Sequence, residues 1–153
     1  MITLKDARQV IAAAEAKAHE LGLIPRVALL SYSNFGNPMG KDGQRVRDAV
    51  ALLDRRGVGF EYDGEMSADV ALNERLMRQL YPFCRLGGPA NILVMPELHS
   101  ANIAAKLLPE LGEGTAVGPL LLGLSHPVQI ANMGATVSDL VNLAALSAHD
   151  AIR

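Results

Sequence analysis

The chain has 153 residues, 50% of them apolar, and a formal net charge of −2, so it can bury the core of one domain but not of two ordinary ones. This near-neutral balance argues against the clustered basic surface that binds nucleic acid or anionic membranes, and no apolar run reaches the roughly 20 residues that span a bilayer. Because Cys84 is the single cysteine and has no disulfide partner, we expect a reducing compartment and therefore a soluble, cytoplasmic domain.

Apolar periodicity predicts helices and strands in alternation. The spacing from Leu4 to Leu21 indicates an amphipathic helix, opened by a capping box of Thr3 and Asp6. Buried strands are expected over residues 27–32, 58–62 and 90–95, a turn over 63–66, and short strands over 116–122 and 127–131. Further helices are expected over 42–57, 68–80, 103–111 and 137–152. This order predicts an α/β fold with a mostly parallel sheet and helices on both faces, a three-layer α/β/α arrangement.

The loop after the first strand is a candidate ligand site. Open α/β sheets bind ligands at the carboxyl ends of their strands, so Ser33, Asn34 and Gly36 are candidate contacts. The alternative is that these residues only shape a turn, with Asp42 capping the next helix.

Three cations follow this loop in the sequence. They can attract the phosphates of a nucleotide-bearing ligand, but such residues more often form the solvated face of a helix. These residues are Lys41, Arg45 and Arg47.

Residues 122–139 resemble the closing motif of the phosphate acetyl/butyryl transferases, in which a proline-valine strand leads into a Ser-Arg-Gly turn. Residues 31–36, 63–69, 90–103 and 117–119 are similar to other parts of the same family, in the same order. The resemblance implies the second half of a phosphotransacetylase, a fold like that of the isocitrate and isopropylmalate dehydrogenases. We therefore expect residues 1–153 to be a single domain and a fragment of a longer multidomain protein.

The catalytic Ser and Arg of that family are replaced here by Asn132 and Met133. Asn cannot accept a proton near neutral pH, and Met cannot neutralise a phosphoryl group, so we expect retained binding without turnover and no catalytic residue in this chain. Gly134 and Asp139 complete the candidate ligand-binding set on this side. Their alternatives are a tight turn with positive φ at Gly134 and a capping box formed by Thr136 and Asp139.

Within the family, residues 127–144 resemble the C-terminal domain of the large bacterial NADP-dependent malic enzymes. That resemblance implies a regulatory domain that senses acetyl-CoA or a related metabolite and contributes to a homo-oligomer, at least a dimer. It also implies a malic enzyme catalytic region in the same polypeptide, which oxidatively decarboxylates malate to pyruvate with NADP and Mg or Mn. No cofactor is expected in this chain itself.

Other reactive residues give weaker indications. The four histidines are scattered without a second ligand at helical spacing, so no metal site is expected. Cys84 is predicted to be an unreactive, half-buried thiol. Glu97 follows a strand end where the family carries an acidic residue. Two alternatives to the regulatory domain stay open: an active phosphate acetyl/butyryltransferase fragment, and a dimerisation module without a ligand.

Overall fold

The computed structural model describes the backbone of residues 4–152 and the side chains of residues 12–152. The chain forms two compact units. One comprises Lys17–Lys106, and the other comprises the chain from Leu107 onward with the N-terminal helix up to Ala16. That residues 1–153 act as one domain stays a prediction, and each unit is described by itself.

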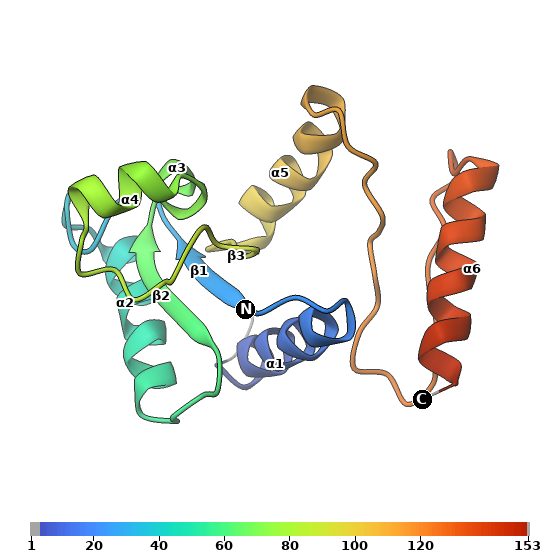
Figure 1. Cartoon of the computed structure of the whole chain (residues 1–153), viewed down its shortest axis with the longest axis horizontal. Helices are drawn as coiled ribbons and strands as arrows, with labels where there is room; N and C mark the ends of the chain where they lie inside the picture. Colours follow the sequence, from blue (N-terminus) through green and yellow to red (C-terminus); the bar gives the residue numbers. More distant parts are fainter. Residues whose placement is uncertain (1–3, 153) are drawn as a thin grey trace. The chain divides into compact units, whose positions relative to one another are not determined.

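The Lys17–Lys106 unit is built on a parallel sheet. Its strands are β1 (Arg26–Leu30), β2 (Glu61–Met66) and β3 (Ile92–Val94), in the order β2-β1-β3 (Figure 1). Helix α2 (Lys41–Asp54) connects β1 to β2, and the short helices α3 (Ala68–Leu72) and α4 (Glu74–Leu80) follow β2. The predicted α/β class with a parallel sheet is confirmed.

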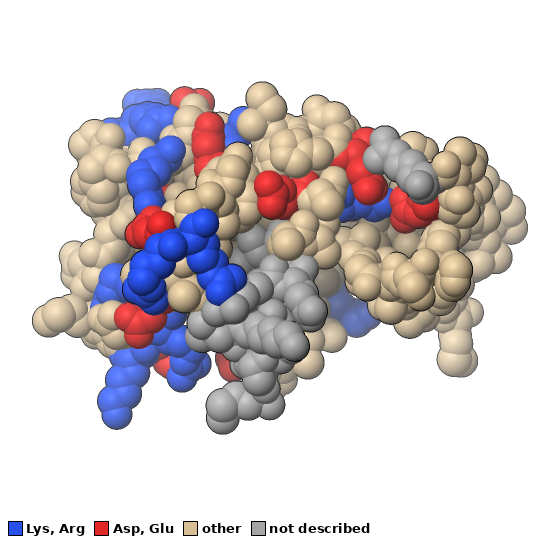
Figure 2. Space-filling view, turned by 90° about the horizontal axis from the view of Figure 1, so that it is seen from below, with Lys and Arg blue, Asp and Glu red and all other residues tan. Residues whose placement is uncertain are grey.

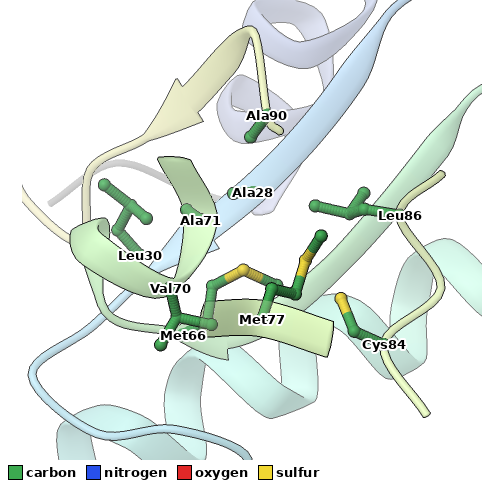
Figure 3. Close-up of a cluster of buried hydrophobic side chains, with 9 residues drawn as sticks. All are labelled: Ala28, Leu30, Met66, Val70, Ala71, Met77, Cys84, Leu86 and Ala90. Atoms are coloured by element: carbon green, nitrogen blue, oxygen red, sulfur yellow. The ribbon is translucent and has the colours of Figure 1, made fainter. Parts of the chain in front are cut away.

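Helices cover both faces of this sheet. Successive side chains of a strand point to opposite faces. Ala28 and Leu30 of β1 join a buried cluster with side chains of α3, α4 and the segment after α4 (Figure 3). Val27 and Leu29 point the other way, and α2, which buries Val46, Val50 and Leu53, packs against β1 and β2. The unit therefore has the predicted three layers.

Three predicted elements were placed wrongly in this unit. The predicted strand 58–62 and turn 63–66 are replaced by strand β2, because pairing with β1 outweighs the turn preference of Asp63 and Gly64. The predicted helix 68–80 is two helices, since the side chain of Asn73 accepts a hydrogen bond from the Leu76 N–H at 3.0 Å and starts α4. Helix α2 has Gly40, not Asp42, at its N-cap.

The other unit contains much of helix α1 (Leu4–Glu20), the end of α5 (Leu98–Leu111), and α6 (Val137–Ala151). The capping box at the start of α6 is confirmed, whereas Thr3 of the first predicted box lies outside the described residues. The predicted strands 116–122 and 127–131 are irregular in the structure. Pro119 has no N–H for a ladder, and the Leu121 N–H bonds to the side chain of Gln129 rather than to a neighbouring strand.

Charge is unevenly distributed along the chain. No Lys or Arg occurs between residues 107 and 152, whereas Figure 2 shows many over the Lys17–Lys106 unit. In the part of the chain that the structure describes, no helix is long and apolar enough to cross a bilayer.

Candidate ligand-binding site

A buried carboxylate organises the predicted ligand loop. Glu65, near the end of β2, is 0% exposed. Its Oε1 accepts hydrogen bonds from the Ser33 hydroxyl at 2.5 Å and from the Gly36 N–H at 3.1 Å. Arg47 of α2 donates from Nη1 to Oε1 at 2.7 Å and to Oε2 at 2.8 Å. One carboxylate thus joins β2, the loop and α2.

The loop itself is a tight, internally bonded turn. Asn34 and Asn37 exchange backbone hydrogen bonds of 2.9 and 3.0 Å, and Asn34 Oδ1 accepts from the N–H of Ser67 at 2.7 Å. Phe35 and Gly36 have φ of 49° and 95°, a left-handed region that glycine adopts without a Cβ penalty. Ser33, Asn34 and Gly36 therefore lie together, but the Ser33 hydroxyl and the Asn34 side-chain oxygen are engaged within the protein.

Arg47 departs from the prediction of a solvated helix face. Its side chain is 26% exposed and paired with Glu65, whereas the side chain of Arg45 is 77% exposed and only 3.8 Å from the Asp42 carboxylate. Gly43 allows this packing, because a Cβ there would lie 2.6 Å from Ser33 Oγ and 2.8 Å from Glu65 Oε1. Lys41 is exposed, in keeping with the solvated alternative.

Glu65 and Gly43 were not among the predicted site residues. The resemblance had included Glu65 in the 63–69 segment, but the turn prediction there obscured its burial. Nothing in the local sequence around Gly43 indicates its close approach to a carboxylate from another element.

The second predicted group lies at the start of α6, in the other unit. Asn132 accepts a backbone hydrogen bond from the Ala135 N–H at 3.0 Å, and the side chain of Met133 is fully exposed. Gly134 does not adopt a positive φ, so the turn does not require glycine for that reason. Asp139 accepts from both the N–H and the hydroxyl of Thr136, each at 2.8 Å.

The Thr136 N–H, followed by the Thr136 hydroxyl, lowers the pKa of Asp139 below its ordinary value of 3.8. A carboxylate with a lowered pKa in the folded state stabilises that state above its unfolded pKa, and the contribution is lost as the pH falls through the folded pKa. We therefore expect the start of α6 to loosen only below pH 3.8. In an acid titration of the unmodified chain, the chemical shift of the Thr136 amide should change below pH 3.8. In the Asp139→Asn variant the same chemical shift should not change with pH. A wild-type transition near neutral pH would contradict this assignment.

A shallow groove also runs along α6. It has a volume of about 480 Å³ and is lined by Thr115, Val117, Ser138, Asn142, Ala145 and Leu146. The groove is open, and its lining mixes hydroxyl and amide groups with apolar side chains.

The remaining candidates are the possible metal ligands, Cys84 and Glu97. Among the described residues, no three His, Cys, Asp or Glu side chains are grouped to hold a metal ion. Cys84 is buried, more fully than predicted, and this burial raises the pKa of its thiol, so the thiolate nucleophile is disfavoured. Glu97 and His99 are exposed at the start of α5.

Residues 3–148 match the phosphate acetyl/butaryl transferase family, and the chain belongs to this family. It is 58% identical to the NADP-dependent malic enzyme of Rhizobium meliloti over 99% of the chain, and 37% identical to the phosphate acetyltransferase of Paracoccus denitrificans over 97%. It spans 20% and 48% of the lengths of these two relatives. The EutD phosphotransacetylase from Staphylococcus aureus has a similar structure, with a TM-score of 0.81 and 34% identity over 97% of this chain and 45% of that one.

Proposed function

We propose that this chain is a catalytically inactive, phosphotransacetylase-like regulatory domain of an NADP-dependent malic enzyme, and that it senses acetyl-CoA. The observation that carries the proposal is the turn before α6, which bears Asn132 and Met133 where the family resemblance places Ser and Arg. The high identity to a malic enzyme over nearly the whole chain supports the choice of parent protein.

The side chains of this turn support the proposed lack of turnover. Acyl transfer between a thiol and phosphate needs a group that moves a proton and a positive charge that stabilises the phosphoryl oxygens. The Asn132 amide can only hydrogen-bond, and the Met133 thioether is uncharged. Binding of the acyl thioester can survive these changes, because it depends on the rest of the site.

A site without turnover suits regulation. A ligand shifts a conformational equilibrium only through different affinities for the two states, and it can do so without being consumed. The parent reaction would be oxidative decarboxylation of malate to pyruvate in the cytoplasm, with NADP and Mg or Mn bound elsewhere in the polypeptide. Exposed apolar side chains on α6, including Val137 and Val141, support an oligomeric assembly, at least a dimer.

Calorimetric titration of the 153-residue chain with acetyl-CoA tests the binding half of the proposal. We expect saturable, weak binding, and no acetyl transfer between phosphate and coenzyme A in a parallel assay. The absence of heat and saturation at millimolar acetyl-CoA would contradict sensing and would favour a purely structural dimerisation module.

The second candidate is a working phosphate acetyl/butyryltransferase that is completed by a separate subunit. The identity to the Paracoccus denitrificans phosphate acetyltransferase favours it. Asn132→Ser with Met133→Arg is the matched comparison, and both proteins are assayed with a complementing N-terminal half of a phosphotransacetylase. Acetyl phosphate formation by the unmodified chain in this assay would establish the second candidate instead.

A further inference from the structure

Arg47 can bind more than its present partners. A guanidinium has five N–H groups. Those of Arg47 donate to the two oxygens of Glu65 and, from Nη2, to Gln44 Oε1 at 2.7 Å. These bonds occupy at most three of the five, and the side chain keeps 26% of its surface exposed. At least two N–H groups of a guanidinium that Glu65 already holds in place are therefore not used by these bonds.

Gly36 places no side chain against this guanidinium. A Cβ at Gly36 would lie 3.6 Å from Arg47 Nη1, so a larger side chain there would extend over the charged group. Glycine thus serves two purposes at this position, since it also adopts the positive φ of 95°.

The distribution of charge makes a cation on this loop important. The turn before α6 carries Met133 where the family resemblance places an arginine, and residues 107–152 contain neither Lys nor Arg. A phosphate-bearing ligand therefore finds no cation in that segment. Arg47 is a cation that the structure fixes directly at the other predicted binding element.

We propose that Arg47 is an anion-binding residue of this chain and that it contacts a phosphate of the ligand through N–H groups that Glu65 does not use. Glu65 is the positioning residue: it orients the guanidinium and balances its charge when no ligand is bound. The identity of the ligand as acetyl-CoA rests on the proposed function, whereas the assignment of a phosphate to Arg47 does not. The phosphate can belong to the nucleotide end of the ligand or be free in solution.

Two variants give effects of opposite sign if this proposal holds. Glu65→Gln keeps one oxygen that accepts from Ser33, Gly36 and Arg47 Nη1, so the guanidinium stays oriented, but it removes the competing negative charge, and acetyl-CoA should bind about threefold more tightly. Arg47→Met combined with Glu65→Gln removes the cation without leaving a buried charge, and affinity should fall about tenfold, a typical effect of losing one charge-assisted hydrogen bond. Titrations with S-acetylpantetheine, which has the thioester but no phosphate, should change little in either variant.

Binding of inorganic pyrophosphate, measured beside binding of acetyl-CoA, tests the Arg47 site independently of the proposed function. If acetyl-CoA does not bind the unmodified chain but pyrophosphate does, and the double variant abolishes that binding, the sensing proposal fails and the Arg47 site stands. Failure of both ligands to bind the unmodified chain would overturn the Arg47 site as well. Similar weakening in both variants, or loss of S-acetylpantetheine binding, would show that the network only shapes the loop and would also overturn it.

A measurement without substitution guards against variants that do not fold. The side-chain Nε–H resonance of Arg47 in the unmodified chain should shift on addition of acetyl-CoA or of pyrophosphate. Binding of either ligand without such a shift would contradict the proposed contact.

Discussion

Gly64→Ala is expected to destabilise the chain by at least about 3 kcal/mol, the range reached when a close-packed backbone must move. A Cβ at Gly64 would lie 2.6 Å from the backbone oxygen of Leu29 and 3.0 Å from its Cβ, inside the β1–β2 pairing. The residue also has a φ of 151°, which L-residues rarely adopt. Urea unfolding followed by circular dichroism measures the loss.

Gly59→Ala is the matched control. An added Cβ at Gly59 meets no atom within 4 Å, and the residue does not have a positive φ. This substitution should change the free energy of unfolding by less than about 1 kcal/mol, and in the stabilising direction if it acts mainly on the unfolded chain. Equal losses in the two variants would show that the close approach of β2 to Leu29 is not what requires glycine.

Arg47→Met alone is expected to cost about 3 kcal/mol, because it leaves the carboxylate of Glu65 buried without its cation. This expected loss of stability lies at the lower end of the range for a buried ion pair that loses one partner, since Arg47 is partly exposed. Adding Glu65→Gln should restore most of the lost stability, because a neutral amide still accepts hydrogen bonds from Ser33 and Gly36. Thermal and urea unfolding of the two single variants and the double variant complete the cycle.

If the losses of stability in Arg47→Met and Glu65→Gln simply add up in the double variant, the expected coupling between these residues is contradicted. Additivity would mean that Arg47 and Glu65 stabilise the chain independently, which their separation of 2.7 Å and the complete burial of Glu65 do not allow. The same double variant serves the binding experiment, so its stability must be established before its affinity is interpreted.

Sequence patterns predicted the parts of the fold that depend on local signals. The apolar run around Val27–Leu30 gave the central strand, and the pair Thr136 and Asp139 gave the start of α6 with its reciprocal hydrogen bonds. Residues 63–66 were misassigned because Asp-Gly favours a turn locally, whereas the observed strand depends on pairing with a segment more than thirty residues earlier. Residues 116–131 are apolar enough for strands, but no described strand pairs with them.

The candidate site was predicted less completely. Position after a buried strand predicts the loop at Ser33–Gly36 as a ligand contact, and the family resemblance predicts Asn132 and Met133; both stay predictions. The role of Arg47 depends on a carboxylate eighteen residues away in the sequence, which a pattern along one helix does not reveal. Partly buried cations are recognised from their three-dimensional partners, and charge alone cannot distinguish them from solvated ones.

Glu65 Oε1 is a single acceptor for donors from three residues: the Ser33 hydroxyl, the Gly36 N–H and the Arg47 guanidinium. An oxygen has two lone pairs, so each donor's share depends on the positions of the other two. A displacement of Arg47 would therefore change how Glu65 Oε1 is shared between the Ser33 hydroxyl and the Gly36 N–H. The carboxylate that anchors the loop to β2 is thus also the group that fixes the guanidinium of α2.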